Sequence, residues 1–432
     1  MIDIEHIYTC FKECTGISTD TRQCKRGMMF VALRGEHFDG NMYAKNALEQ
    51  GCRYAIVDCA AIADPFDERY LLVDNSLQAL QQLAKYHRRT IGTTIIGITG
   101  TNGKTTTKEL IAAVLSRKYN IHYTQGNLNN HIGVPLTLLQ LTAEHEIAIV
   151  EMGASHPGDI KELVEIAEPN YGLITNVGIA HLQGFGSLEG VISTKSELYD
   201  YLRTTERRTI FLNTDNHHLY HIAQGLRTIT YGQSEEADIC GRFINCAPYL
   251  RFQWKRRGGA WHEVATRLIG NYNIDNTLCA AAVGVYFDVS ETDISAVLAN
   301  YAPTNNRSQL IQTGRNTLIV DAYNANPTSM RAAIDNFALM EGTRKMLILG
   351  DMKELGEATA AAHQEIIDRL NKCNLDEVWL VGSAFAATQH TLRSFADAEE
   401  VKTVLNTECP TGRTILIKGS NSMKLASLVE WL

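Results

Sequence analysis

A glycine-rich loop between an apolar run and a helix-like run constrains the fold of this chain more than any other feature. The loop lies in residues 95–110, which read IIGITGTNGKTTTKEL. Glycines let successive backbone N–H groups turn toward an anion, and the following helix adds its partial positive charge. Lys104 and Thr105 follow Gly103, where a lysine can reach terminal phosphates and a threonine hydroxyl can bind Mg²⁺. This context predicts an α/β domain with a nucleoside triphosphate site.

The glycine spacing departs from the general phosphate-loop template. That template places its first glycine five residues before the second, but the residue five before Gly103 is Ile98. The glycines stand instead at positions 97, 100 and 103. The alternative interpretation is an ordinary strand-to-helix turn with a surface lysine. The Gly-Lys-Thr sequence at the start of the helix favours the phosphate site.

Apolar, β-branched runs alternate with helix-like runs along most of the chain, which predicts parallel βαβ units. A length of 432 residues suggests about three domains. We therefore predict an α/β fold with a small α/β domain over residues 1–90, a central parallel-sheet domain over 91–308, and a C-terminal Rossmann-like, doubly wound domain over 309–432. Short alternating segments in residues 233–266 predict an antiparallel patch within the central domain.

Local signals place several helix ends and one linker. The glycine loop continues into a predicted helix over about residues 104–119, and Ser76 is the expected cap of an earlier helix. Ser290 and Asp293 stand at the spacing of a capping box. Residues 302–309, APTNNRSQ, have the composition of a linker between domains.

Composition limits the classes of binding partner and the cellular compartment that we expect. A formal net charge of -8 gives the whole chain no attraction to nucleic acid or to an anionic membrane. No apolar run approaches the roughly 18 residues of a membrane helix, and the first residues resemble no signal peptide. The ten cysteines form no C-x-x-C pair, which favours reduced thiols over zinc ligands. We expect a cytosolic protein that does not insert into membranes.

Three further polar residues have open interpretations when each is taken alone. Glu151 ends an apolar run, where it could hold Mg²⁺ at the carboxyl edge of the sheet or simply be solvated. His181 follows the next predicted strand and is more often structural, unless a metal or a phosphate lies close. Lys195 by itself is typical of a surface helix.

Nine motifs in a fixed order change how these three polar residues are interpreted. They read GITGTNGKTTTKE, GNLNNHIGVPLTLL, VEMGASHPGDI, ITNVGIAHLQGFGS, TKSELY, GNYNIDNTLCAAA, DAYNANPTSM, LGDMKELG and IKGSNSM. Their order resembles the Mur ligases, the ATP-dependent amide ligases of peptidoglycan synthesis, over essentially the whole chain. The shifted glycine spacing resembles the loop of the same family and of its folate relatives. The segment STDTRQCKRGMMFVALRGEHFDG resembles the region that receives the UDP end of the substrate.

Within the family, DAYNANP, LGDMKELG and KGSNSM resemble the branch that joins D-alanyl-D-alanine to UDP-N-acetylmuramoyl-tripeptide. The Asp-Asn-Pro-Arg motif typical of the sister enzyme that adds the third amino acid is not found in the sequence. Folylpolyglutamate synthase shares the glycine loop but lacks the UDP-binding domain. The resemblance implies an acyl-phosphate intermediate and leaves lysine or diaminopimelate open at the third peptide position. A P-loop kinase, a GTPase-type switch or a non-enzymatic nucleotide-binding scaffold would explain the loop alone.

The resemblance implies roles for residues that the sequence alone leaves open. Thr105 and Glu151 would bind the Mg²⁺ of ATP, His181 would serve a second Mg²⁺, and CO₂ would carbamylate Lys195 into an anion between the two ions. Lys104, Lys195 and His181 are the implied catalytic residues. The implied ATP contacts are Gly100, Thr101, Asn102, Gly103, Lys104, Thr105, Thr106, Asn273, Arg307 and Asp321. The implied substrate contacts are Ser18, Asp20, Thr21, Arg22, Asn127, Asn129, Asn130, Tyr323, Asn324, Asn326 and Lys418.

Three positions depart from the family pattern. The family often has histidine where Tyr272 stands, glycine where Asn306 stands, and histidine where Asn41 stands. These departures affect the implied adenine and uracil contacts more than the phosphate and metal sites. We expect a monomer whose C-terminal domain closes on the ATP loop, because ATP-matching residues lie on both sides of the predicted linker.

Overall fold

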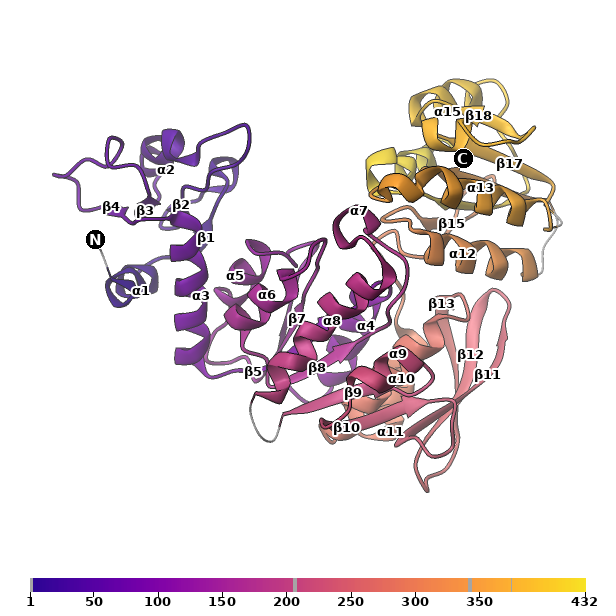
Figure 1. Cartoon of the computed structure of the whole chain (residues 1–432), viewed down its shortest axis with the longest axis horizontal. Helices are drawn as coiled ribbons and strands as arrows, with labels where there is room; N and C mark the ends of the chain where they lie inside the picture. The colour runs from indigo at the N-terminus through magenta and orange to yellow at the C-terminus, as the bar shows by residue number, and fades with distance from the viewer. Residues whose placement is uncertain (1–2, 205–207, 341–343, 374) are drawn as a thin grey trace.

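Three β-sheets organise the chain into three units. The computed structural model describes residues 3–204, 208–340, 344–373 and 375–432. The N-terminal unit is built on strands β1–β4, the central unit on β5–β13 and the C-terminal unit on β14–β19. Figure 1 shows the units in chain order, with the N-terminal unit at one end and the C-terminal unit against the central one. The predicted division into three α/β parts agrees with these sheets.

The N-terminal unit has a four-stranded, fully parallel sheet in the order β1-β2-β3-β4. One face packs against α1 and α3, whose buried side chains include Ile7 and Leu83, and α2 covers the other face with Ala44 and Leu48. The elements are β1 (Ile17–Ser18), β2 (Met29–Val31), β3 (Tyr54–Val57), β4 (Tyr70–Leu72), α1 (Ile4–Lys12), α2 (Ala44–Glu49), α3 (Ser76–Ile91), η1 (Thr21–Gln23) and η2 (Gly40–Tyr43).

The expected cap of α3 is wrong by one residue. Asn75 is the N-cap, because its extended backbone lets the side chain accept a hydrogen bond from the Gln78 N–H at 2.9 Å. Ser76 already belongs to the helix, and its buried hydroxyl has no hydrogen-bond partner among the residues that the structure describes. The helix ends at Gly92, whose φ of 77° is the left-handed conformation typical of a glycine C-cap.

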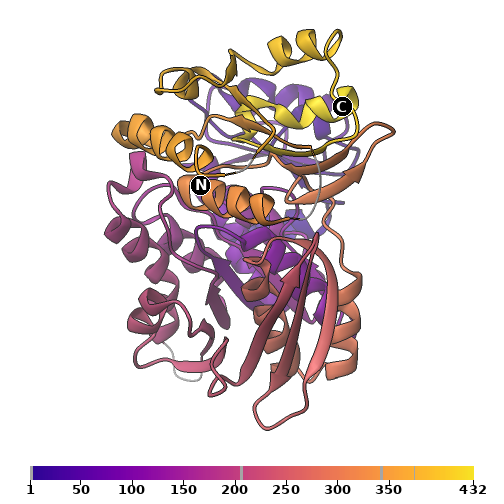
Figure 2. The ribbon, with the colours of Figure 1, turned by 90° about the vertical axis from the view of Figure 1, so that its right-hand side faces the viewer.

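The central unit has a nine-stranded sheet in the order β13-β12-β11-β10-β9-β8-β5-β7-β6. Strands β6 to β11 pair in parallel, whereas β11, β12 and β13 pair antiparallel, so the predicted antiparallel patch is confirmed and the sheet is mixed. Figure 2 shows the three antiparallel strands side by side below the C-terminal unit. The strands are β5 (Thr94–Thr99), β6 (Ile121–Tyr123), β7 (Ile147–Glu151), β8 (Tyr171–Ile174), β9 (Thr209–Asn213), β10 (Arg227–Gly232), β11 (Ile239–Cys246), β12 (Tyr249–Arg256) and β13 (His262–Ile269).

The helices of the central unit are α4 (Lys104–Leu115), α5 (Gly133–Leu138), α6 (Asp159–Ala167), α7 (Leu182–Phe185), α8 (Leu188–Arg203), α9 (His217–Ile222), α10 (Asn273–Tyr286) and α11 (Glu291–Asn300). The expected capping box of α11 is present in part, because the Ser290 hydroxyl accepts from the Asp293 N–H and meets its carboxylate at 2.7 Å. Helix α4 ends four residues earlier than expected. The chain turns after Leu115, and the Tyr119 hydroxyl reaches the Phe287 carbonyl at 2.9 Å.

The C-terminal unit is doubly wound, as predicted. Its six strands lie in the order β14-β15-β19-β16-β17-β18, and only β14 pairs antiparallel. Along β16, Leu347 and Leu349 pack into one apolar cluster, whereas Met346 and Ile348 pack into another. Successive side chains of a strand point to opposite faces, so helices cover both sides. The elements are β14 (Gln309–Gln312), β15 (Thr317–Asp321), β16 (Lys345–Gly350), β17 (Glu377–Val381), β18 (Arg393–Phe395), β19 (Thr414–Lys418), α12 (Pro327–Leu339), α13 (Thr359–Leu370), α14 (Ser383–Ala386), α15 (Ala398–Leu405), η3 (Gly356–Ala358), η4 (Asn421–Met423) and η5 (Leu425–Trp431).

Candidate functional site

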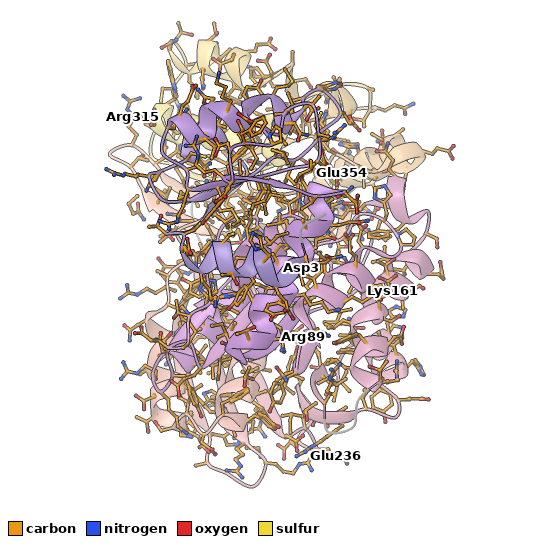
Figure 3. All side chains as sticks on the ribbon, turned by 90° about the vertical axis from the view of Figure 1, so that its left-hand side faces the viewer. Asp3, Arg89, Lys161, Glu236, Arg315 and Glu354 are labelled. Atoms are coloured by element: carbon orange, nitrogen blue, oxygen red, sulfur yellow. The ribbon has the colours of Figure 1, made fainter. Side chains whose placement is uncertain are left out.

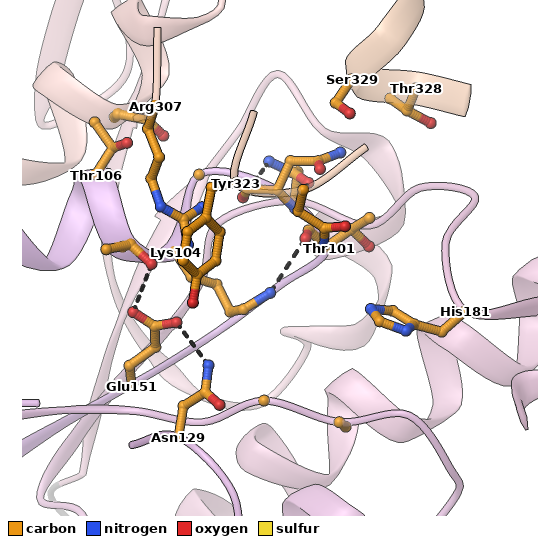
Figure 4. Close-up of a pocket in the computed structure, with 18 of the residues that line it drawn as sticks. Thr101, Lys104, Thr106, Asn129, Glu151, His181, Arg307, Tyr323, Thr328 and Ser329 are labelled. Atoms are coloured by element: carbon orange, nitrogen blue, oxygen red, sulfur yellow. Dashed lines mark hydrogen bonds between the residues drawn. The ribbon is translucent and has the colours of Figure 1, made fainter. Parts of the chain in front are cut away.

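The strand order of the central sheet places three loops together at its carboxyl edge. Strand β5 lies between β7 and β8, so the glycine loop after β5 has the ends of both neighbours beside it. Ligands of open α/β sheets bind at this edge. A cavity of about 660 Å³ opens there, between the glycine loop and the first turn of α12 in the C-terminal unit (Figure 4). Residues from both units therefore line a single site.

The glycine loop requires glycine at two of its positions. Gly100 has φ 143°, and a Cβ there would lie 2.0 Å from the Thr175 hydroxyl. Gly103 has φ 78°, and a Cβ there would lie 2.7 Å from the Asn276 side-chain oxygen. Helix α4 begins immediately afterwards, at Lys104. The backbone thus follows the path that a phosphate loop needs, with its N–H groups next to a helix N-terminus.

Two residues after β8 hold this loop, and the sequence analysis missed both. Asn176 accepts from the Asn102 N–H at 3.0 Å and donates to the Asn102 carbonyl at 3.0 Å. The Thr175 hydroxyl donates to the same carbonyl at 2.6 Å. The available signal was their position directly after a strand that neighbours β5. These bonds fix the loop before any ligand arrives.

Lys104 lies across the loop that precedes it. Its Nζ donates to the carbonyls of Gly100 at 2.6 Å and Thr101 at 3.1 Å. The pKa of Lys104 is lowered to about 8; burial is the main cause, Glu151 opposes it, and Arg307 adds to the lowering. A phosphate group beside this amine would favour its charged form.

Glu151, at the end of β7, is 2% exposed and receives hydrogen bonds on both carboxylate oxygens. The Thr105 hydroxyl donates to Oε2 and the Asn129 amide donates to Oε1, each at 2.9 Å (Figure 4). The structure therefore brings together the predicted magnesium residues Thr105 and Glu151. Lys108, which the sequence analysis did not single out, is also buried here, with its Nζ 3.9 Å from Glu151. A lysine one helical turn after Lys104 was the available signal.

His181 and Lys195 lie on the α7–α8 side of the cavity. His181 lines the cavity, whereas Lys195 is 2% exposed and lies behind it, with its Nζ 5.3 Å from the Phe185 ring centre. Burial holds the pKa of Lys195 well below its ordinary value, and the charge of Lys104 acts in the same direction. Burial also lowers the pKa of His181, with Glu354 opposing and the two lysines adding. Burial therefore disfavours the charged form of the Lys195 amine.

The C-terminal unit and the segment that leads into it contribute a second group of charged residues. Lys418 is 1% exposed and donates to the Asp321 carboxylate at 2.6 Å and to the Asn324 carbonyl at 3.3 Å. The Arg307 guanidinium lies 3.9 Å from the centre of the Tyr323 ring. All five residues line the cavity. Two anchored cations, Lys418 in the C-terminal unit and Arg307 in the segment that leads into it, therefore line the cavity with the glycine loop.

A reciprocal amide pair joins the two units beside the cavity, which Asn102 lines and Asn326 does not. Asn102 lies in the glycine loop, and Asn326 is the N-cap of α12 with a complete capping box. The Asn326 amide donates to the Asn102 side-chain oxygen at 2.8 Å, and the reverse bond is 3.5 Å long. A residue predicted to bind ATP and a residue predicted to bind substrate are thus directly paired.

Two of the departures from the family pattern have structural explanations. Asn306 has φ 55°, a left-handed conformation that glycine adopts easily and asparagine tolerates. The hydroxyl of Tyr272 lies 2.7 Å from that of Ser308, so this residue ties α10 to the segment that leads into the C-terminal unit. Asn273 is 3% exposed, and its amide donates to the Ile269 carbonyl at 2.8 Å. The predicted adenine contact therefore lies at the wall of the cavity.

Several predicted substrate residues lie outside this cavity. Ser18, Asp20, Thr21 and Arg22 belong to the N-terminal unit, where the Arg22 guanidinium pairs with Asp20 at 2.7 Å. Asn127 does not line the cavity either, whereas Asn130 does, and its side-chain oxygen accepts a hydrogen bond from the Gly133 N–H at 2.8 Å.

Asn41, the third departure, is fully buried. Its amide donates to the carboxylates of Asp39 at 2.7 Å and Asp58 at 2.8 Å. These bonds use both of its amide hydrogens, so Asn41 links two carboxylates inside the N-terminal unit.

Family models match three successive parts of the chain. The model described as Mur ligase family, catalytic domain, matches residues 13–88. The Mur ligase middle domain matches residues 98–284, and the Mur ligase, glutamate ligase domain, matches residues 306–421. Together these matches cover most of the chain in one order.

Curated relatives are similar over nearly the whole length. The UDP-N-acetylmuramoyl-tripeptide–D-alanyl-D-alanine ligase of Bacillus subtilis is 35% identical over 427 residues, covering 96% of this chain and 92% of the relative. The ligase of the same name from Escherichia coli is also 35% identical, covering 96% of this chain and 93% of the relative.

Solved structures agree with this similarity. A crystal structure of MurF from Acinetobacter baumannii has a TM-score of 0.87 at 30% identity, covering 99% of this chain and 97% of that one. MurF ligase from Thermotoga maritima in complex with ADP has a TM-score of 0.84 at 26% identity, covering 100% and 98%. A folylpolyglutamate synthase from Mycobacterium tuberculosis shares the fold, with a TM-score of 0.63 at 14% identity, covering 82% of this chain and 94% of that one.

In the parts of the chain that the structure describes, no helix is both long and apolar enough to cross a membrane. The family matches, the near-full-length relatives and the loop geometry agree with one another. The chain belongs to the Mur ligase family of ATP-dependent ligases that form amide bonds.

Proposed function

We propose that this chain joins D-alanyl-D-alanine to UDP-N-acetylmuramoyl-tripeptide in the cytoplasm, as a step of peptidoglycan precursor synthesis. The observation that carries the proposal is the cavity shared by the glycine loop and the C-terminal unit. One wall offers a phosphate loop and a buried carboxylate, and the other offers Lys418, Asp321 and the N-terminus of α12. The activity named for the 35% identical relatives supports the same reaction.

The reaction has two balanced steps. A carboxylate oxygen of the tripeptide forms a bond to the γ-phosphorus of ATP while the bond between that phosphorus and the β,γ-bridging oxygen breaks, which gives an acyl phosphate and ADP. The neutral amine of D-alanyl-D-alanine then bonds to the acyl carbon, the carbon–oxygen bond to phosphate breaks, and the nitrogen loses a proton. The products are an amide and inorganic phosphate.

Charge neutralisation is the main demand of the first step, because the carboxylate and the ATP phosphates repel each other. We assign the terminal phosphates to the backbone N–H groups of residues 100–106 and to the Lys104 amine. Arg307 and Asp321 contact ATP from the C-terminal side, and Asn273 contacts adenine. This arrangement needs no covalent enzyme intermediate, since positioning and charge carry the step.

Glu151 at the end of β7 and Thr105 in the first turn of α4 fit Mg²⁺. Thr105 and Glu151 present hard oxygen donors 2.9 Å apart, in a site where the carboxylate is only 2% exposed. His181 and a carbamylated Lys195 would hold a second ion; an amine reacts with CO₂ in its neutral form, and burial disfavours the charged form of Lys195. When bound, the ions would neutralise the phosphate charge in the transition state.

We assign the remaining predicted residues to contacts with the two substrates. Ser18, Asp20, Thr21 and Arg22 of the N-terminal unit receive the UDP end, and the loop of Asn127, Asn129 and Asn130 receives the muramoyl-peptide. Tyr323, Asn324, Asn326 and Lys418 face the amine substrate. The enzyme works as a monomer in this account, since one chain carries all three groups of residues.

Phosphate release separates the proposed ligase from its rivals. With ATP and Mg²⁺, we expect release only when both UDP-N-acetylmuramoyl-tripeptide and D-alanyl-D-alanine are present at substrate levels. A kinase or a GTPase-type switch would turn over nucleotide without the amine. A non-enzymatic scaffold would bind ATP and release nothing with any UDP-peptide. Release that ignores both substrates would overturn the proposal.

A further inference from the structure

A carboxylate from the C-terminal unit reaches a histidine of the central unit. Glu354 lies after β16, and one of its carboxylate oxygens is in ion-pair contact with Nδ1 of His181, a buried nitrogen that makes no hydrogen bond of regular geometry with the described residues. Figure 3 shows Glu354 at the boundary between the two units. His181 lines the cavity on the side of Lys104, toward which its ring points in Figure 4. The two nitrogens of the imidazole therefore have different surroundings.

The backbone around Glu354 is fixed from within the C-terminal unit. Asp351 is fully buried and accepts hydrogen bonds from the N–H groups of Ala384 at 3.1 Å and Phe385 at 3.0 Å. The Lys353 N–H donates to the Ser420 hydroxyl at 3.0 Å. Leu355, on the other side of Glu354, is 2% exposed in the apolar core. Glu354 itself has φ 65°, so a tightly held turn projects its side chain outward.

The histidine in the central unit is also held in place by its surroundings. His181 has φ 50° and packs edge-on against Phe185, with ring centres 6.2 Å apart. The Gln183 N–H donates to the backbone carbonyl of Glu354 at 3.3 Å. A main-chain bond between the units therefore sets the register at which the carboxylate meets the imidazole.

The stability that this contact supplies is small. The Glu354 side chain is 59% exposed and that of His181 is 28% exposed. Exposed ion pairs contribute about 0–1 kcal/mol. A contact that does little for stability can still fix which nitrogen carries the proton, since the partner of one ring nitrogen sets the role of the other.

We propose that Glu354 is a positioning residue: when the C-terminal unit is docked, its carboxylate accepts the Nδ1–H of His181, which leaves Nε2 unprotonated toward the cavity. Docking of the C-terminal unit and completion of the His181 metal site then become one event. The inference rests on the proposed function, in which His181 serves a metal ion. Carboxylates and carbonyls commonly orient metal-binding histidines in this way.

Three variants and a control test the inference. Glu354→Ala removes the acceptor, Glu354→Gln keeps an acceptor oxygen without the charge, and Glu357→Gln changes a neighbouring exposed carboxylate. Alanine and glutamate bear the same left-handed backbone cost, so Glu354→Ala adds no strain. The first readout is Mn²⁺ binding, measured by electron paramagnetic resonance with a non-hydrolysable ATP analogue and the UDP-tripeptide. The second is the set of steady-state constants, and thermal unfolding checks the fold.

For Glu354→Ala we expect one Mn²⁺ site to weaken and kcat to fall, each about 10–100-fold, with KM for D-alanyl-D-alanine and the unfolding temperature unchanged. Glu354→Gln should recover most of the lost Mn²⁺ affinity and kcat, and Glu357→Gln should match the unmodified protein. In a His181→Ala background, Glu354→Ala should cause no further loss of either quantity.

Unchanged Mn²⁺ binding and kcat in Glu354→Ala would overturn the inference, as would an equal loss in the His181→Ala background. A rise confined to KM for D-alanyl-D-alanine would overturn it too, by assigning Glu354 to the amine substrate. Failure of the proposed function is recognised separately, because the unmodified protein would then show no substrate-dependent phosphate release.

Discussion

Three basic side chains lie on one side of the cavity: Lys104 and His181 line it, and Lys195 is buried behind it. Burial lowers the pKa values of Lys104, His181 and Lys195, and Lys104 acts on both of the others. Lys195 is the most enclosed, at 2% exposure. A site that disfavours three positive charges gains from any anion placed in it, whether a nucleotide phosphate or a carbamate on Lys195.

Lys195→Ala tests the carbamate at the residue scale. We expect kcat to fall by at least about 100-fold, because the variant would lose the proposed carbamate and its negative charge. Added formate or acetate should restore much of the activity by placing carboxylate oxygens in the vacated space. Full activity of the unrescued variant would remove Lys195 from the mechanism. Lys161→Ala, which changes an exposed lysine of α6, serves as the control.

Asp275 gives a residue-scale prediction for stability. Burial, with the nearby charge of Asp215, raises the pKa of Asp275 from 3.8 to about 6. The folded state then binds the proton more tightly than the unfolded state, so this contribution is present below about pH 4 and is lost as the pH rises through 6. The shift corresponds to at most about 3 kcal/mol.

Asp275→Asn removes this titration. In the ligand-free protein we expect urea unfolding to show a gain of roughly 1–3 kcal/mol at pH 7.5 and none at pH 4. An equal gain at both pH values would contradict the assigned cause, since it would be independent of ionisation.

At the scale of elements, α3 gives a direct test of which residue caps a helix. Asn75→Ala should cost about 0.5–2 kcal/mol of unfolding free energy, because the Gln78 N–H loses its acceptor. Ser76→Ala should be neutral or slightly stabilising, because it removes a buried hydroxyl that has no partner. Denaturant titration of the two variants measures the difference. A larger cost for Ser76→Ala would restore serine as the cap.

Sequence patterns predicted most elements because local rules govern them. The strand–loop–helix around Gly103, the antiparallel patch and the cap at Ser290 all follow from periodicity or capping within a few residues. The errors lie where two neighbouring residues compete, as with Asn75 and Ser76, or where a distant contact ends a helix, as Tyr119 does by meeting Phe287. Propensity cannot settle such choices, since tertiary packing overrides it.

At the scale of the whole molecule, the three units could be predicted, but the contacts between them could not. Asn102 with Asn326 and His181 with Glu354 join residues that are more than 170 positions apart. No local signal marks Glu354 as the partner of a histidine in another unit. The same holds for Asn176, whose role depends on strand order rather than on its own neighbourhood.

We predict that the C-terminal unit closes onto the central unit when ligands bind. The described contacts between the glycine loop and α12 are few and polar, so we expect ligands to shift the population toward the docked arrangement. Small-angle scattering should give a smaller radius of gyration with an ATP analogue and the UDP-tripeptide than without them. Asn326→Ala should weaken this compaction by removing the pair with Asn102. Unchanged dimensions on ligand addition would contradict closure.

Transfer of labelled oxygen tests the central claim most directly. If the tripeptide carboxylate carries ¹⁸O in both positions and the chain turns over ATP with D-alanyl-D-alanine, the acyl-phosphate route moves one labelled oxygen into the released phosphate. Mass spectrometry should then find singly labelled phosphate in equal amount to the new amide, which keeps the other labelled oxygen. Unlabelled phosphate, or phosphate released without amide, would contradict the proposed ligase.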